Sequence, residues 1–247
     1  MMFIDTHTHI LEEEASEYYN NAIEANVKIM LTASEDLKTS LEAVRIANEF
    51  PNVFACIGVH PSDAKDFKDE YIDKFRELCK DNKVVAIGEI GLDYYYGKDD
   101  KDRQIEVFRM FLSLAEEFKL PVVIHTREAT LDTINILKEY NVKGVIHCFN
   151  GSIETAREYM KLGFSFGIGG VLTFKNSKLF ETVKEIPLDN IVLETDSPYL
   201  APEPFRGKKN ESKYISVIGE CLAMHTGKSL EEIAQMTTSN AKKIFNI

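Results

Sequence analysis

The sequence has few cysteines, and they lie far apart. Its 247 residues include four, Cys56, Cys79, Cys148 and Cys221, and no two of them form a CxxC pair. A disulfide framework or a zinc ribbon needs closely spaced cysteines, so neither is indicated. A chain of this length can bury a large core without such crosslinks. The cysteine usage fits a protein of the reducing cytoplasm.

Long apolar runs are also missing. No stretch approaches the roughly 20 consecutive apolar residues that a membrane-spanning helix requires. The first ten residues, MMFIDTHTHI, carry an acid and two histidines where a secretory signal needs an apolar segment. We therefore expect a soluble protein that resides in the cytoplasm.

Positive charge is in deficit. Lysine and arginine together number 29 against 40 aspartates and glutamates, which gives a formal net charge of -11. A broad nucleic-acid clamp binds through many Lys and Arg contacts with phosphate, so this surface argues against one. An enzyme that holds one nucleic-acid end in a locally basic pocket remains compatible with the charge.

Short apolar runs alternate with amphipathic segments along the whole chain. The predicted strands are 3–5, 27–31, 53–59, 84–89, 122–125, 145–148, 164–168 and 191–194, and the predicted helices are 17–25, 36–50, 68–80, 102–118, 129–139, 153–162, 177–185, 214–224 and 230–244. This order predicts an α/β fold of parallel βαβ units, and eight strands suit a closed (β/α)₈ TIM barrel. An open doubly wound sheet is the alternative, but its glycine-rich fingerprint after the first strand is absent. Without a recognisable linker, residues 1–247 are expected to form one domain.

Histidines gather where predicted strands end. Five of the six do so, namely His7, His9, His60, His125 and His147, whereas His225 falls on a late helix. Barrel enzymes build their sites from the carboxyl ends of strands, so these side chains should converge. His7 and His9 are two residues apart, which places both on one face of a strand. Imidazoles so arranged suit a divalent metal.

Each of these residues has a plainer interpretation when taken alone. His7 and His9 could end a strand without binding a ligand, His60 could be a turn residue beside Pro61, and His125 and His147 could be core imidazoles. Their common position at strand ends favours a site instead.

Two carboxylates occupy the same kind of position. Glu89 ends an apolar run, where an unpaired buried carboxylate would be costly, so we expect a cation beside it. Asp196 could cap the Ser197-Pro198 turn, but it also ends a strand. Cys148 follows His147 and is expected to face away from it into packing.

The combined motifs resemble a known family. DTHTH, GVHP, GEIGLDYY, IHTREA, HCFNGS, ETDSPYLAP and PFRGKKNES occur in this order over essentially the whole chain, and together they are similar to the TatD-type metal-dependent deoxyribonucleases of the amidohydrolase superfamily. The chain departs from the family pattern at three positions: Ser62, where many relatives have histidine, Asn150, where serine is common, and Ser212, where a proline often follows Asn-Glu. These departures bear on substrate preference and remove no ligand.

The resemblance implies a barrel with two divalent metals. It assigns His7, His9 and Asp196 to the first metal, Glu89 as a bridge to the second, and His125 and His147 as completing the second site. His60 and Arg206 would contact the substrate phosphate.

The chemistry of these residues supports hydrolysis by a metal-activated water. Imidazole and carboxylate ligands without thiolate suit magnesium, manganese, zinc or iron. Glu89 and Asp196 would be the catalytic carboxylates, with Asp196 accepting or orienting the proton of the attacking water. His60, Arg127 and Arg206 would bind the non-bridging oxygens, with Lys208 and Lys209 adding positive charge nearby. Tyr94, Tyr95 and Tyr96 would either stack on a terminal base or pack within their loop.

Three functions are compatible with these residues. The first is a metal-dependent DNase that cleaves phosphodiester bonds exonucleolytically from a single-stranded DNA end. The second is an amide or ester hydrolase of the amidohydrolase type, for example an aminoacyl-tRNA deacylase. Phosphate-binding residues next to the metals would be superfluous for a simple amide. The third is a metal-binding scaffold without catalysis, which the intact ligand set disfavours.

Overall fold

Eight parallel strands form a nearly closed barrel in the computed structural model, which describes residues 2–96 and 98–247. The strands are β1 (Phe3–Thr8), β2 (Val27–Ala33), β3 (Val53–Ile57), β4 (Val84–Asp93), β5 (Val122–Arg127), β6 (Gly144–Ile146), β7 (Ser165–Ile168) and β8 (Ile191–Leu193). They neighbour one another in sequence order. The predicted (β/α)₈ TIM barrel is confirmed.

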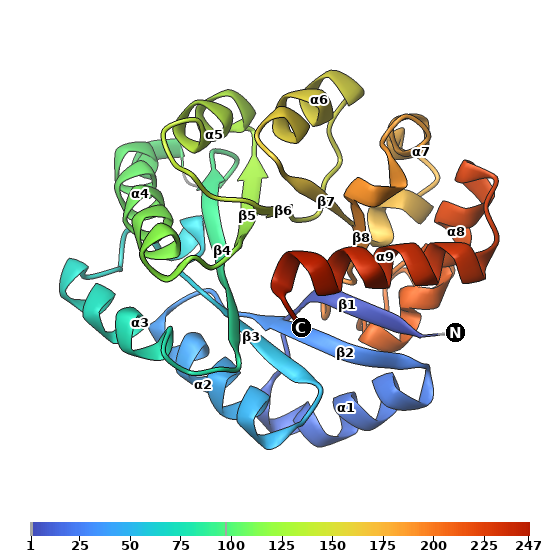
Figure 1. Ribbon diagram of the computed structural model, residues 1–247, viewed down its shortest axis with the longest axis horizontal. Helices are drawn as coiled ribbons and strands as arrows, with labels where there is room; N and C mark the ends of the chain where they lie inside the picture. Colours follow the sequence, from blue (N-terminus) through green and yellow to red (C-terminus); the bar gives the residue numbers. More distant parts are fainter. Residues whose placement is uncertain (1, 97) are drawn as a thin grey trace.

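Helices surround the strands on the outside (Figure 1). They are α1 (Ala15–Glu24), α2 (Leu37–Glu49), α3 (Ile72–Leu78), α4 (Lys101–Phe118), α5 (Thr130–Leu137), α6 (Ile153–Lys161), α7 (Leu179–Val183), α8 (Ile215–Thr226) and α9 (Leu230–Phe245). None of the helices in the described ranges is long and apolar enough to cross a membrane.

The first and last strands meet at their carboxyl ends. Thr8 and Ser197 form an isolated parallel bridge. The Asp196 N–H donates to the His7 carbonyl at 2.9 Å, and the His9 N–H donates to the Ser197 carbonyl at 2.7 Å. The backbone that closes the barrel is therefore the same backbone that carries three of the predicted ligands.

Two apolar layers hold the barrel. The larger cluster fills the space between strands and surrounding helices. The smaller takes side chains from β1 to β6 and β8, among them Ile4, Leu31 and Val123, and lines the inside of the barrel together with Ala241 and Phe245 of α9. Figure 1 shows α9 lying across one end of the barrel. The helix thus closes the interior on one side.

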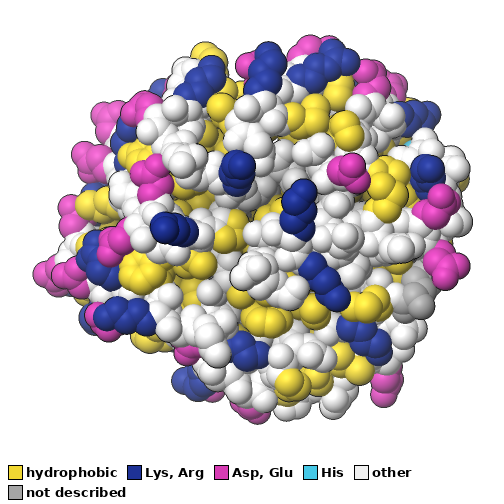
Figure 2. All heavy atoms as spheres, viewed as in Figure 1, with side chains coloured by type: hydrophobic (Ala, Val, Ile, Leu, Met, Phe, Trp, Pro, Cys, Tyr) yellow, Lys and Arg dark blue, Asp and Glu magenta, His cyan; other side chains and the backbone are white. Residues whose placement is uncertain are grey.

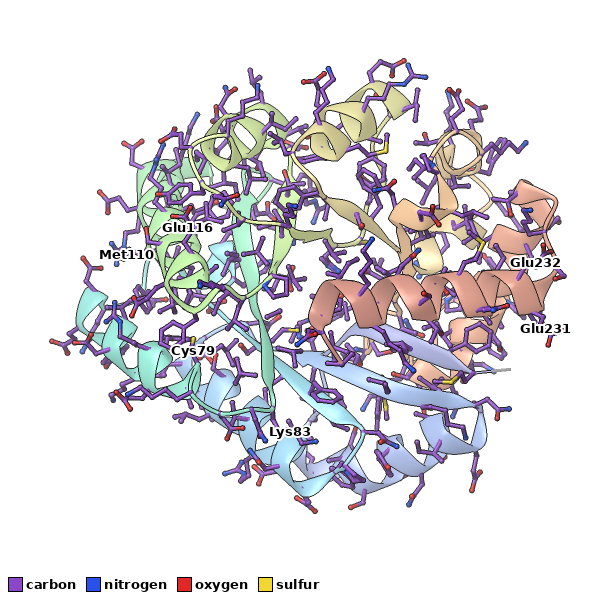
Figure 3. All side chains as sticks on the ribbon, in the orientation of Figure 1. Cys79, Lys83, Met110, Glu116, Glu231 and Glu232 are labelled. Atoms are coloured by element: carbon purple, nitrogen blue, oxygen red, sulfur yellow. The ribbon has the colours of Figure 1, made fainter. Side chains whose placement is uncertain are left out.

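Side-chain hydrogen bonds fix the start of α9 and the turn between α2 and β3. Ser229 and Glu232 form a reciprocal capping box at the start of α9, where Figure 3 shows Glu231 and Glu232. Lys83, also labelled there, donates to the carbonyls of Phe50, Pro51 and Val53 at 3.2, 2.9 and 3.0 Å. These bonds tie the turn between α2 and β3 to the residue that precedes β4.

The face crossed by α9 has no concentrated basic patch. In Figure 2 the Lys and Arg side chains on that face are scattered singly among apolar and acidic ones. A nucleic-acid groove would require them to be contiguous.

We predict that Phe245→Ala destabilises the barrel strongly. Phe245 is buried in the interior cluster, and removing a buried aromatic side chain typically costs about 3–5 kcal/mol. Urea unfolding followed by circular dichroism measures the change in the free energy of unfolding. Met224→Ala, at an exposed position of α8, is the control and should change that free energy by less than about 0.5 kcal/mol. Equal effects of the two substitutions would contradict a core role for α9.

Candidate metal centre

Glu89 of β4 lies at the centre of the candidate site and is only 3 % exposed. Its Oε1 is 2.8 Å from His125 Nδ1, 3.5 Å from His147 Nε2 and 3.7 Å from His60 Nε2. Its Oε2 is 3.3 Å from His7 Nε2 and 3.8 Å from His9 Nε2. One buried carboxylate therefore faces all five histidines that the sequence placed at strand ends.

Asp196 is a second carboxylate that lies close to three of these imidazoles. Its Oδ1 is 3.7 Å from His9 Nε2 and 3.8 Å from the Nε2 atoms of both His7 and His147. The residue lies three positions beyond the end of β8 in a left-handed backbone conformation, with φ of 58°. This bend turns the carboxylate inward toward the histidines of β1.

The outer ring nitrogens of three histidines face acceptors. His9 Nδ1 lies 3.1 Å from the Ala33 carbonyl oxygen, His125 Nε2 lies 3.1 Å from Asp93 Oδ2, and His147 Nδ1 lies 3.0 Å from Glu194 Oε1. For His9 and His125 this hydrogen bond favours the tautomer that leaves the inner lone pair free for a metal. His147 Nδ1 lies beside Glu194 without the geometry of a hydrogen bond.

The donor set fits a divalent cation. His7, His9 and Glu89 offer ligand atoms within 4.8 Å of one another, and so do His7, His147 and Asp196. His7 Nδ1 is buried without a hydrogen-bond partner in the described ranges, so the side-chain polar contacts of this imidazole are made through Nε2. Neutral imidazoles and carboxylates without a thiolate suit magnesium, manganese or zinc.

His60 has a different hydrogen-bonding pattern. Its Nδ1 accepts the Ser62 N–H at 3.1 Å, so the ring proton must sit on Nε2, which faces the site. Burial lowers the pKa of His60 to about 4, which keeps the ring neutral at pH 7. His60 can therefore donate a hydrogen bond into the site, whereas its inner nitrogen has no lone pair for a metal.

Charge in the cluster is balanced between acids and imidazoles. Burial opposes ionisation of Glu89, but His147, His60 and His7 hold its pKa well below the usual range. Burial likewise opposes protonation of His147, yet Glu194, Glu89 and Asp196 raise its pKa to about 10. Protons on the imidazoles thus take the place of positive charge that the carboxylates require, and a bound cation would displace them.

The sequence analysis missed two carboxylates that orient the histidines. Asp93 ends β4, four residues beyond Glu89, and Glu194 is fully buried just before Asp196. Asp93 is the last residue of an apolar strand that carries Glu89, and Glu194 directly follows the apolar strand β8. Their burial after such a run was the available signal, since a buried carboxylate needs a donor.

A third missed residue, Asp5, anchors the strand that carries the His7 and His9 pair. Its carboxylate accepts from the Thr195 N–H at 3.0 Å, from Thr195 Oγ1 at 2.6 Å and from Ser212 Oγ at 2.5 Å. Complete burial raises the pKa of Asp5 to about 7 despite these bonds. Ser212, one of the three departures from the family pattern, supplies a hydroxyl that a proline would lack.

The arginines and lysines predicted to lie near the substrate phosphate are at the surface. The Arg127 guanidinium stacks 3.9 Å from the Tyr95 ring centre. The Arg206 guanidinium lies 4.1 Å from the Phe174 ring centre, and its Nη1 donates to the Ala201 carbonyl at 3.2 Å. Lys209 forms an ion pair with Glu14, whereas Lys208 lies over the Phe205 ring. Arg127, Arg206 and Lys208 have no acidic partner within 4.0 Å in residues 2–96 and 98–247.

The structure decides between the two alternatives for Tyr94 and corrects the expectation for Cys148. Tyr94 packs against the core and donates to Asp132 Oδ2 at 2.9 Å, which is the packing alternative. Cys148 does not alternate with His147, because β6 ends at Ile146 and Cys148 adopts a φ of 46°. Its N–H instead donates to Glu194 Oε1 at 2.6 Å. His225 is partly exposed on α8, where its ring stacks on Phe180.

We predict that Asp93→Asn weakens metal binding by about 10- to 100-fold, because an amide holds the His125 tautomer less well than a carboxylate does. Titration of metal-stripped protein with zinc or manganese by calorimetry measures the affinity. Asp132→Asn is the matched control, since Asp132 also accepts a side-chain hydrogen bond but from Tyr94 at the surface. Wild-type affinity in Asp93→Asn would show that the carboxylate does not orient His125.

Comparisons with known proteins find relatives that match the whole length of the chain. The model of the family described as TatD related DNase matches residues 4–246. The uncharacterized metal-dependent hydrolase YabD of Bacillus subtilis is 44% identical over the full length of both chains, and YcfH of Escherichia coli is 37% identical over all of this chain and 97% of its own. The crystal structure of YjjV, a TatD homologue from Escherichia coli, superposes with a TM-score of 0.94 at 28% identity, covering 99% of this chain and 98% of that one.

Proposed function

The chain belongs to the family of TatD-related DNases and is a metal-dependent hydrolase, and from this premise we propose that it cleaves phosphodiester bonds in DNA. We propose further that it acts exonucleolytically on single-stranded ends, with two divalent ions of magnesium, manganese or zinc. Four cysteines without a disulfide fit a cytoplasmic enzyme.

The observation that carries this proposal is the hydrogen-bond donor beside the metal ligands. His60 presents Nε2–H to the site 3.7 Å from Glu89 Oε1 and cannot serve as a ligand through that atom. A donor next to the metal ligands suits a non-bridging phosphoryl oxygen, which carries negative charge throughout the reaction. An amide or ester is neutral in its ground state and offers such a donor negative charge only in its tetrahedral transition state.

The proposed ligands divide around Glu89. His7, His9 and Asp196 would hold one ion, His125 and His147 the other, with Glu89 reaching both. Bound there, the ions would supply Lewis-acid stabilisation of phosphoryl charge and would lower the pKa of an attacking water.

The protein groups would perform the remaining steps. Asp196 would accept the proton of the attacking water, because its carboxylate stays ionised beside His147 and His9, which hold its pKa below the usual value against the effect of burial. His60 would donate to a non-bridging oxygen, and Arg127 and Arg206 at the surface would bind neighbouring phosphates. The net charge of -11 supports binding of a short single-stranded end over a long duplex.

We predict that metal-stripped protein leaves 3′- and 5′-labelled single-stranded DNA intact and that added magnesium, manganese or zinc restores stepwise shortening. Asp196→Asn should lower kcat by about 10²- to 10⁴-fold, because the amide cannot accept the proton. Denaturing gels of timed samples measure the rate, and the position of the label gives the polarity. Asp189→Asn, at an exposed aspartate, is the control.

We predict that His60→Ala lowers the cleavage of single-stranded DNA by about 10²-fold, the usual effect of removing one transition-state donor. Hydrolysis of a small carboxylic ester should fall much less. His225→Ala on α8 is the matched histidine control. A protein that binds metal, leaves all nucleic acids intact and hydrolyses esters or aminoacyl-tRNA would overturn the nuclease proposal.

A further inference from the structure

We propose that Tyr95, Tyr96 and Arg127 form a stacking platform for an unpaired base of the substrate, held at a fixed position relative to the metal centre by Asp93. This inference rests on the proposed nuclease function and specifies how that function would recognise its substrate. The three residues are called the aromatic platform below.

The aromatic platform consists of large flat groups left open to solvent. The side chains of Tyr95 and Tyr96 are 54 % and 73 % exposed, and their rings meet edge to face at 4.6 Å. The Arg127 guanidinium lies 3.9 Å from the Tyr95 ring centre and 4.8 Å from that of Tyr96. Exposed aromatic surface next to a functional site is typical of a binding surface.

Arg127 differs from most other arginines of the chain in its partners. Arg76, Arg103, Arg109 and Arg157 form ion pairs with Glu117, Asp69, Glu139 and Glu185, respectively. Within the part of the chain that the structure describes, Arg127 has no carboxylate within 4.0 Å. Its positive charge and planar face are therefore available to a phosphate or a base.

A single carboxylate connects the aromatic platform to the metal centre. Asp93 Oδ1 accepts the backbone N–H groups of Tyr95 at 2.9 Å and Tyr96 at 3.1 Å. Its Oδ2 lies 3.1 Å from Nε2 of His125, whose other nitrogen faces Glu89. The turn that carries the two rings is thus fixed to the imidazole proposed to hold a metal.

The surrounding backbone makes this connection rigid. Asp93 pairs with Arg127 across β4 and β5, and the Tyr94 N–H donates to the Arg127 carbonyl at 2.9 Å. Gln104 of α4 accepts from the Asp93 N–H at 2.8 Å and donates to its carbonyl at 3.0 Å. The aromatic platform therefore keeps one distance from the metal centre, as positioning a scissile bond requires.

These properties specify the ligand as an unpaired nucleobase. A base inside a duplex has both faces covered by its neighbours, whereas a terminal or single-stranded base offers a free face. Stacking on tyrosine and arginine accepts any base, so cleavage should show little sequence preference. Binding should instead depend on the presence of a base near the scissile phosphate.

Binding can be tested without catalysis. Metal-stripped protein in EDTA is titrated with single-stranded oligonucleotides that carry 2-aminopurine or an abasic residue at successive positions from the cleaved end. Stacking should quench 2-aminopurine fluorescence at one or two adjacent positions. Tyr95→Ala combined with Tyr96→Ala should abolish the quench and weaken binding by about 10-fold or more.

Substitutions of graded severity separate stacking from folding. Tyr95→Phe keeps the ring and should keep the quench, whereas Arg127→Met should reduce both the quench and the affinity. Lys74→Ala is the matched control, because Lys74 also lies over a tyrosine ring, at 5.0 Å from the centre of Tyr71, but belongs to α3. Circular dichroism confirms that each variant is folded.

The ratio of the cleavage rates of two oligonucleotides, one with intact terminal bases and one with abasic ends, is the decisive measurement. With metal restored, the wild type should cleave an oligonucleotide with intact terminal bases faster than one with abasic ends, and this ratio should fall toward one in the double alanine variant. An unchanged ratio and unchanged quench in that variant overturn the aromatic platform while leaving the nuclease proposal standing. A wild-type protein that neither binds nor cleaves DNA overturns both.

Discussion

The structure of the site depends on a carboxylate buried where a carboxylate alone would be unstable. Glu89 is 3 % exposed at the mouth of the barrel and faces five imidazoles. Burial of an unpaired ion costs several kcal/mol, so this position requires positive charge in contact with it. Protonated histidines supply that charge in the metal-free protein, and divalent ions would supply it more strongly. Asp93 and Glu194 lie beside the outer nitrogens of His125 and His147, and we expect them to orient these two rings.

The barrel places these groups together because parallel strands all end at the same rim. β1 and the segment after β8 close the barrel through backbone bonds at His7, His9 and Asp196, so closure and ligand placement are one event. Asp5 reinforces that seam from outside by bonding Thr195 and Ser212. Loss of any of these bonds would shift one of the proposed ligands. The buried hydrogen bonds of Asp5, Thr195 and Ser212 therefore support the site as well as the barrel.

Sequence reasoning identified the barrel and the converging residues because both depend on periodicity. The Nε2 atoms of His7 and His9 lie 3.2 Å apart, so the two imidazoles converge, although His9 lies one residue beyond the end of β1. The expectation failed for Cys148, because a strand end and a positive φ cannot be read from alternation. The roles of Asp93 and Glu194 were missed because they depend on contacts between strands. The stacked positions of Arg127 and Arg206 were missed for the same reason.

Anomalous diffraction from a crystal soaked in manganese or zinc tests the central claim most directly. The account predicts two peaks between the six side chains of His7, His9, Glu89, His125, His147 and Asp196, with Glu89 in contact with both ions and His60 in contact with neither. A single peak, or a peak bound to His60 Nε2, would contradict the division of roles derived from the hydrogen bonds of these histidines. Peaks only at surface carboxylates would contradict the metal centre itself.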